Sequence, residues 1–510
     1  MKTEKNKLYW LIAVATLIRI MVAICIDLGN DEVYYVTYAQ HLQWNYFDHP
    51  PMVALLIRLT TLNLLFTNEF FIRLGPIVLA AVNTFLVYKI TSQIKNDKAG
   101  FIAAVLFSSS IYASVIAGLF ILPDAPQLFF WIAALYFLIQ IIYSPENGAK
   151  FKRNILLFGV LAGLCIMSKI HGVFLWFGFG LYVLLYNRSL LLNKYIYLSV
   201  LITALIISPI LIWNIENDWI TYSFHSNRVT INSGINPSSF LREFLGGAFY
   251  NNPINYVLIV MALFAVLKNK ITIDVSVKRL LLLMSLPLIV LLLFIALFRD
   301  TLPHWSGPAF VGLIILASSY LADLKINSKS LLQLPKGVMA SGILIIVVLV
   351  AGPLVINYYP GTMGKTADDN LGLFDATLDM YDWEFFESEF ENIRQSDIKL
   401  KKTNTTFIIN NKWFPAAHID HYIAEPLKLD FVAVGKLEDI HTYAWLNQHR
   451  KQLNAGDDAY FITFSNSFLN PDELYSKKFV KINKPVIVTQ YRNNLPARKM
   501  LVYLLESYKG

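Results

Sequence analysis

The sequence predicts a polytopic α-helical membrane protein that ends in a small soluble α/β domain. Its 510 residues are 56% hydrophobic and only 15% charged. Apolar runs of about 17–22 residues recur from Tyr9 onward, and each is long enough to cross a hydrocarbon core of about 30 Å. The formal net charge of +8 is spread over short basic clusters between these runs. Such clusters are typical of membrane topology, so no nucleic acid is expected as a partner.

About eleven spans are expected. The N-terminal MKTEKNK and the apolar run after it look like a signal peptide. That run is too long for a signal peptide and lacks a small-x-small cleavage site, so it is expected to remain as the first span. Cys25 and Cys165 lie in or beside apolar runs and are expected to be small buried side chains. The expected spans are 8–28, 71–91, 100–118, 126–143, 154–170, 172–187, 195–213, 254–268, 279–298, 306–322 and 337–357.

The distribution of basic residues predicts the orientation of these spans. If the N-terminus is cytoplasmic, the inward connections carry most of the lysine and arginine, as the positive-inside rule requires. The outward connections then hold the short stretches rich in acids, histidine and tryptophan, including FILPDAP, SKIHG, NIENDW and FRDTLPHW. The inward residues are Lys2, Lys5, Lys7, Lys95, Lys98, Lys150, Lys152, Arg153, Arg188, Lys194, Lys268, Lys270, Lys278, Arg279, Lys325, Lys329 and Lys336.

The chain changes character after Tyr358. Residues 361–510 are polar and contain no spanning run. The strand-like pieces TTFIINN, LDFVAVG, AYFITFS and KPVIVTQY alternate in part with the helix-like pieces PAAHIDHYIAE and HTYAWLNQHR, which predicts an α/β domain. We therefore expect a transmembrane catalytic domain over 1–358, with an outer loop of interfacial helices at 29–70, and an outer soluble domain over 359–510.

The first outward stretch, GNDEVYYVTYAQHLQWNYFDHPP at 29–51, carries two adjacent acids. Asp31 and Glu32 would serve as a general base with a metal or hydrogen-bond partner. The competing interpretation is a solvated helix cap, since Asn30 and Asp31 are good N-cap residues. His41, Asp48 and His49 follow within twenty residues. The aromatic residues between them predict a segment that lies along the membrane surface.

Further charged residues are expected on the same face. Asp48 fits a helix cap, His49 could contact a phosphate or a metal, and Arg58 follows on a second surface helix. Arg73 and Lys169 either extend to the membrane interface or hold a phosphate. The remaining candidates in these connections are Asp124, His171 and His304. Asp31, Glu32 and His49 could bind a divalent cation, but their spacing is not diagnostic of a metal site.

Several of these motifs together resemble one known family. DEVYYVTYAQHLQWNYFDHPP, LPDAPQLFFW, GVLAGLCIMSKIHG, SPILIWNIENDW, LPHWSGPAF and YDWEFF are similar to segments of bacterial family 39-type glycosyltransferases. These belong to the GT-C superfamily and are related to protein O-mannosyltransferases and lipid A aminoarabinose transferases. The resemblance covers about residues 8–325 well and the soluble domain more loosely.

The resemblance implies sugar transfer at the outer face of the bacterial cytoplasmic membrane, with inversion, from a polyprenyl-phosphate-linked donor. Asp31 would act as base on an acceptor hydroxyl or position an acceptor phosphate, and Glu32 would support it. Lys169 and Arg73 become candidate phosphate ligands, and Asp124 a residue of the site. His49 stands where the aminoarabinose branch has the lysine of Glu-Lys-Pro, so aminoarabinose specificity is not implied.

Three other functions compete with this interpretation. A lipid or solute transporter or flippase would need ionisable residues deep inside its spans, whereas most of those here lie in loops. A GT-C polysaccharide polymerase would share the fold but not the reaction. A receptor-like binding protein would use the outer domain as its binding module. For a transferase, the acceptor could be a lipid A-like glycolipid, a polysaccharide or a protein hydroxyl.

Overall fold

The computed structural model describes residues 2–146, 148–230, 234–324 and 334–510. Contacts divide the chain into two units, and the division does not follow the change in composition. The first unit comprises Met1–Met21 and Gln43–Leu349, and the second comprises Val22–Leu42 and Val350–Gly510. The predicted boundary at residue 358 stays a prediction. The first part of the opening stretch, up to Leu42, nevertheless belongs to the same unit as the C-terminal domain, and composition gave no sign of this.

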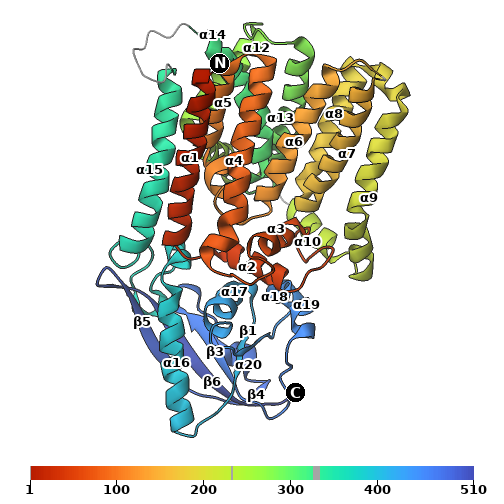
Figure 1. Cartoon of the computed structure of the whole chain (residues 1–510). Coiled ribbons are helices and arrows are strands. Elements are labelled where there is room, and N and C mark those ends of the chain that lie inside the picture. The colour runs from red at the N-terminus through yellow and green to blue at the C-terminus, as the bar shows by residue number, and fades with distance from the viewer. Residues whose placement is uncertain (1, 147, 231–233, 325–333) are drawn as a thin grey trace. The chain divides into compact units, whose positions relative to one another are not determined.

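The first unit is a helical bundle of long, apolar elements (Figure 1). Most of its helices have hydrophobic side chains around much of their circumference, as expected where both lipid and protein neighbours are apolar. Its helices are α1 (Lys2–Cys25, which continues into the second unit), α3 (Met52–Thr60), α4 (Glu69–Ile94), α5 (Asp97–Ser109), α6 (Asp124–Ile142), α7 (Ala149–Ser168), α8 (Val173–Tyr186), α9 (Lys194–Glu216), α10 (Ile220–Val229), α11 (Pro237–Tyr250), α12 (Pro253–Leu267), α13 (Val275–Ala296), α14 (Phe310–Asp323) and α15 (Lys336–Tyr358, which also continues into the second unit).

Among the described residues, eight helices are long and apolar enough to span a membrane, or nine if one bent pair counts as a single span. All eleven expected runs are helical, but three are shorter than a full span or bent. The run at 100–118 stops as α5 at Ser109 and continues as a π-helical turn, and the run at 172–187 forms the 14-residue α8. The run at 254–268 is α12, which meets α11 at 99°. The predicted class, a multi-pass helical membrane protein, is confirmed.

The centre of the bundle is the span Pro303–Asp323, which contains α14. In that span 94% of the apolar window is buried, compared with 22% in α15 and 22% in α1. The interior span is therefore the one that carries the LPHWSGPAF motif. α1 and α15 present most of their surface outward, where lipid would cover it.

The second unit is built on a six-stranded sheet. Strands β1, β2 and β3 are parallel, and β6 pairs antiparallel with β3, β4 and β5. The order is β2-β1-β3-β6-β4, with β5 also on β6. Its elements are α2 (Asn30–Gln40), α16 (Trp383–Lys399), β1 (Phe407–Asn410), α17 (Trp413–Ile419), β2 (Asp430–Ala433), α18 (Leu437–Ile440), α19 (Tyr443–Leu446), β3 (Ala459–Phe464), α20 (Pro471–Tyr475), β4 (Phe479–Ile482), β5 (Val486–Arg492) and β6 (Leu495–Tyr508).

The four predicted strands correspond to β1, β2, β3 and β5, so the α/β prediction is confirmed. The sequence analysis missed β4 and β6, although β6 is the longest strand at 14 residues. Its sequence, LPARKMLVYLLESY, mixes charged and apolar residues without a strict period of two. Pairing with three neighbouring strands, rather than a local pattern, explains why it is extended.

Candidate functional site

The two acids of the opening stretch have different environments in the first turn of α2. Gly29, not Asn30 or Asp31, is the N-cap residue, and its backbone N–H donates to Glu32 Oε2 at 2.9 Å. The Glu32 side chain is buried, at 2% exposure, whereas Asp31 is exposed. The carboxylate of Glu32 therefore closes the helix end as in a capping box. Asp31 is the acid that remains accessible for chemistry.

The segment Asp375–Trp383 holds this stretch from the C-terminal side. Asn30 Nδ2 donates to Asp379 Oδ2 at 2.8 Å, and the backbone N–H of Trp383 donates to Asp27 Oδ2 at 2.8 Å. His418 Nε2 lies 3.1 Å from the carbonyl oxygen of Leu28 and 3.0 Å from that of Asp379. The segment Asp375–Trp383 thus holds the start of α2 in place through these hydrogen bonds.

Asp379 is a residue that the sequence analysis missed. It lies in the 3₁₀-helix Ala376–Met380, and burial raises its pKa from the ordinary 3.8 to about 6, against the opposing effects of Arg498 and Asn30. Asp31 is close enough for its charge to raise the pKa further. The signal available in the sequence was one acid among several in DATLDMYDW. Only its position against Asn30 makes it distinctive.

Replacing Asp379 with asparagine is expected to stabilise the protein at pH 8. The folded-state pKa of Asp379, about 6, exceeds the ordinary 3.8. The contribution of this carboxyl to the free energy of unfolding is therefore fully present below pH 4 and is lost as the pH rises through 6. The full effect corresponds to about 3 kcal/mol of unfolding free energy. Thermal unfolding in nanodiscs at pH 4–8 would measure it, with Asp472→Asn, an exposed acid in the first turn of α20, as control. A constant difference between wild type and Asp379→Asn at every pH would contradict the prediction.

The tyrosines of α2 are buried in the protein. Tyr34, Tyr35 and Tyr38 are 0–5% exposed, and the Tyr34 ring lies 5.0 Å from that of Trp413 and 6.0 Å from that of His441. α2 therefore packs on the residues that follow β1 and β2. A run of tyrosines fits the wall of a protein core as well as a lipid interface. The expected placement of this segment along the membrane surface stays a prediction.

In the first unit, Asp48 and His49 form a turn that α10 holds in place. His225 Nε2 lies 2.6 Å from the carbonyl oxygen of Asp48, and Thr221 Oγ1 donates to the carbonyl oxygen of Tyr46 at 2.9 Å. The rings of His49 and His225 are 6.0 Å apart. His225 was not predicted from the sequence, because it carries no signal beyond its place in a connection that is expected to face outward.

The two candidate arginines lie at the ends of neighbouring helices. Arg58, near the end of α3, donates to Asn63 Oδ1. Arg73, in the second turn of α4, has no exposed surface, and its guanidinium lies 5.6 Å from the ring of Phe120. Arg73 therefore does not extend to the membrane interface. Its burial is compatible with the alternative role, that of an anion ligand.

Asp124 and Lys169 form a buried ion pair. Lys169 Nζ lies 2.8 Å from Asp124 Oδ2, and the two side chains are 4% and 3% exposed. Tyr112 donates its hydroxyl to Asp124 Oδ1 at 3.1 Å. A Cβ at Gly307 would lie 2.4 Å from the Tyr112 ring, so the glycine of LPHWSGPAF allows this close approach. Lys169 is thus buried and paired rather than extended to the interface.

Two histidines complete the polar group around this pair. His171, in the 3₁₀-turn after α7, lies with its ring 5.5 Å from Trp305, and His304 lies 5.8 Å from the ring of Tyr250. Both histidines are close enough to Asp124 and Lys169 to interact electrostatically with their charges. His171 Nδ1 is buried and has no hydrogen-bond partner in the described part of the chain. This nitrogen is suited to a ligand.

The ten predicted site residues therefore fall into both units. Asp31 and Glu32 belong to the second unit. The other eight belong to the first, where Asp124, Lys169, His171 and His304 form one cluster and Asp48 and His49 form a separate turn. In the four described ranges, no three or more histidine, cysteine or acidic side chains are placed to hold a metal ion. A divalent cation therefore gains no candidate ligand set from these residues.

Comparison with known proteins gives the fold. The sequence model of the family described as dolichyl-phosphate-mannose-protein mannosyltransferase matches residues 48–213. The crystal structure of ArnT from Cupriavidus metallidurans in the apo state is 12% identical, with a TM-score of 0.59 and 98% of both chains covered. The same protein bound to undecaprenyl phosphate is 13% identical, with a TM-score of 0.63 and the same coverage. The chain shares the fold of ArnT, a GT-C membrane fold.

A curated relative of this GT-C protein is the lipid A galacturonosyltransferase RgtD of Rhizobium johnstonii. The two are 25% identical over 295 residues, which make up 57% of this chain and 60% of the relative. The chain therefore matches less than two thirds of that relative's length. The matched family segment runs from the Asp48–His49 turn to the end of α9 and includes both partners of the buried ion pair.

Proposed function

We propose that this GT-C protein transfers a sugar from a polyprenyl-phosphate-linked donor to an acceptor on the outer face of the cytoplasmic membrane, with inversion. The observation that carries the proposal is the buried Asp124–Lys169 pair in the first unit, with the half-buried His171 and His304 beside it and His171 Nδ1 buried without a partner among the described residues. Buried polar groups without a full set of partners cost stability, and they are retained where a ligand completes them.

The reaction balances with the residues of this chain. The acceptor oxygen bonds to the anomeric carbon as the bond from that carbon to the donor phosphate breaks, and the polyprenyl phosphate leaves as an anion. Asp31 accepts the proton of an acceptor hydroxyl. Lys169, Arg73 and His171 stabilise the leaving phosphate, and carboxylates stabilise the oxocarbenium-like sugar. Glu32 fixes the first turn of α2 and so orients Asp31.

The relatives favour particular substrates. ArnT was solved with undecaprenyl phosphate, which supports a lipid-phosphate donor here. RgtD is named for lipid A, which supports a lipid A-like glycolipid acceptor over a polysaccharide or a protein. The charge distribution of the connections supports the outward orientation of the site. A flippase or a GT-C polymerase is the alternative function and would leave the donor panel described below unused.

Asp31→Asn is expected to lower the transfer rate by at least about 10²-fold while leaving thermal stability unchanged, because a positioned base contributes that much and the side chain is exposed. The assay uses membranes with a panel of radiolabelled polyprenyl-phosphate sugars and separates glycolipid, polysaccharide and protein products. Asp472→Asn is the matched control, since it makes the same change in another first helical turn. Equal transfer by wild type and Asp31→Asn would refute the role of Asp31 as the general base. If the wild type uses no donor, the transferase proposal itself fails.

A further inference from the structure

Five apolar side chains of the second unit are exposed close to the C-terminal end of α15, the last helix that is long and apolar enough to span a membrane. They are Tyr358 at 67% exposure, Met363 at 54%, Phe374 at 82%, Tyr491 at 57% and Leu495 at 51%. We call them the hairpin-tip surface, after the turn between β5 and β6, because Tyr491 and Leu495 lie in these strands on either side of that turn. Large apolar side chains exposed together are unusual in water and mark a binding surface.

Backbone bonds bring the segments that carry these residues together. The N–H of Gly361 donates to the carbonyl oxygen of Arg492 at 2.9 Å, and Asn493 Nδ2 donates to the carbonyl oxygen of Tyr358 at 3.2 Å. The N–H of Met363 donates to Asp375 Oδ2 at 2.7 Å, next to Phe374. The five side chains therefore come from three adjoining segments rather than from scattered sites.

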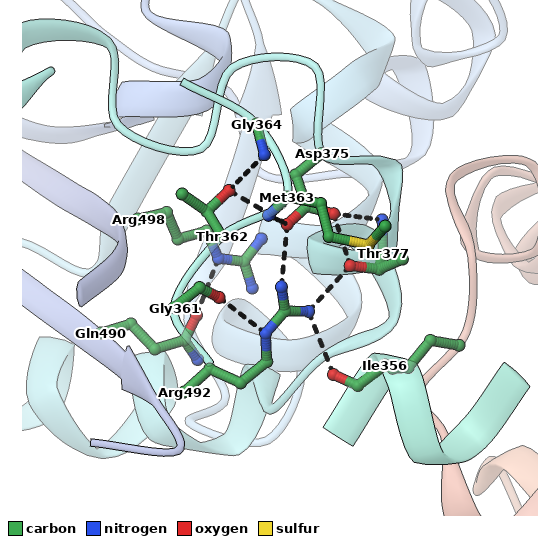
Figure 2. Close-up of polar contacts among 10 residues, drawn as sticks. All are labelled: Ile356, Gly361, Thr362, Met363, Gly364, Asp375, Thr377, Gln490, Arg492 and Arg498. Atoms are coloured by element: carbon green, nitrogen blue, oxygen red, sulfur yellow. Dashed lines mark hydrogen bonds and ion pairs between the residues drawn. The ribbon is translucent and has the colours of Figure 1, made fainter. Parts of the chain in front are cut away.

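Figure 2 shows how firmly this turn is fixed to α15. Arg492 has no exposed surface; its Nη1 donates to the carbonyl oxygen of Ile356 at 3.1 Å and its Nε to that of Gly361 at 2.8 Å. Its Nη2 pairs with Asp375 at 2.8 Å. Ile356 lies in the last turn of α15, a helix long and apolar enough to span the membrane. The hairpin tip is thus attached at the point where the chain leaves the bilayer.

That attachment sets the depth of the surface. Between the hydrocarbon core of about 30 Å and the full bilayer of about 40–45 Å lies an interfacial layer of about 5–8 Å on each side. Residues bonded to the last turn of a span lie within that layer. Tyrosine is enriched there because its ring is apolar and its hydroxyl stays wet.

We infer that the hairpin-tip surface docks the second unit on the lipid bilayer, with its apolar side chains inserted at headgroup depth. Lys365 suits this role, since its Nζ lies 5.7 Å from the Phe374 ring and can meet anionic lipid phosphates. Of the two acids that follow Lys365, Asp368 is paired with Lys499, and Asp369 is exposed. This docking is independent of the proposed sugar transfer and would hold for a flippase of the same fold.

Spin labels test the docking in the full chain. In a Cys25→Ser background, Phe374→Cys and Met363→Cys are labelled with a nitroxide in nanodiscs of phosphatidylethanolamine and phosphatidylglycerol; Cys165 is buried and stays unlabelled. Val480→Cys on β4 is the matched control, because Val480 is an apolar residue of the same unit with 68% exposure. At 363 and 374 the ratio of oxygen to water-soluble nickel collisions should be several-fold higher than at 480.

Each other result overturns the inference. Ratios equal to that at Val480 would mean that the surface faces water. Labels shielded from both oxygen and nickel would mean that protein covers it. Spin–spin broadening between labels would mean that the cover is a second copy of this chain.

Discussion

Replacing Lys169 with methionine is expected to lower the free energy of unfolding by about 3–5 kcal/mol. The lysine and Asp124 are both almost fully buried, with Nζ and Oδ2 2.8 Å apart. Removing the cation leaves a buried carboxylate paired only by hydrogen bonds, and breaking a buried pair from one side costs about that much. Thermal and denaturant unfolding in detergent or nanodiscs would measure the loss.

The double variant Asp124→Asn, Lys169→Met distinguishes the effect of the pair on stability from its effect on transfer activity. It leaves no unpaired charge and is expected to recover most of the lost stability. If Lys169 binds the donor phosphate, transfer activity stays lost although stability returns. A double variant that is both stable and active would refute the proposed role of the pair. Lys451→Met is the control, because Lys451 pairs with Asp430 at an exposed position, where about 0–1 kcal/mol is expected.

Arg492→Met is expected to cost the second unit a comparable 3–5 kcal/mol. Arg492 and Asp375 are 0% and 1% exposed, and the guanidinium also bonds Thr377 Oγ1 and two carbonyl oxygens (Figure 2). Its loss leaves the Asp375 carboxylate buried without its cation and frees the last turn of α15 from the hairpin. Unfolding of the full chain, followed by heat or by limited proteolysis after residue 358, would report the loss.

The matched control for Arg492 is Arg394→Met. Arg394 pairs with Glu391 one turn away on α16, with side chains 17% and 28% exposed, so less than about 1 kcal/mol is expected. The Asp375→Asn, Arg492→Met double variant should be more stable than Arg492→Met. Equal stability of wild type and Arg492→Met would show that the contacts of Arg492 with Asp375 and α15 do not hold this unit together.

The contribution of the Asp375–Arg492 pair to stability depends on pH with the opposite sign from that of Asp379. Burial alone would raise the pKa of Asp375, but hydrogen bonds from Thr377 and Met363 and the charge of Arg492 hold it below the ordinary value. Its stabilisation is therefore present above the unfolded-state value of about 4 and is lost as the pH falls further. Asp379, whose pKa is raised, gives up stability as the pH rises.

Much of the fold could be predicted from hydropathy and residue type. Each expected span is helical and four of the six strands were placed, because these elements follow local apolar runs. The failures are elements fixed by contacts: β6 is extended because three strands pair with it, and α12 meets α11 at 99° instead of crossing alone. The burial of the α2 tyrosines was likewise not predicted.

For the candidate site, the sequence supplied the residue types and the structure supplied their partners. SKIHG and LPDAP were identified separately, but nothing local shows that Lys169 pairs with Asp124 45 positions earlier. Deleting residues 361–510 would not test the loop site alone. The structure shows that it would also remove Asp379, Trp383 and His418, which hold the first turn of α2.

The sequence by itself determined that this chain crosses a membrane many times, has a C-terminal α/β domain, and carries adjacent acids just after its first apolar run. Hydropathy and charge determine these features because they act through the nearest residues and the surrounding solvent. Only the tertiary structure decided that Glu32 closes a helix while Asp31 stays exposed, and that residues 22–42 fold with residues 350–510. Those outcomes depend on burial and on hydrogen bonds between segments more than 300 residues apart, as between Asn30 and Asp379.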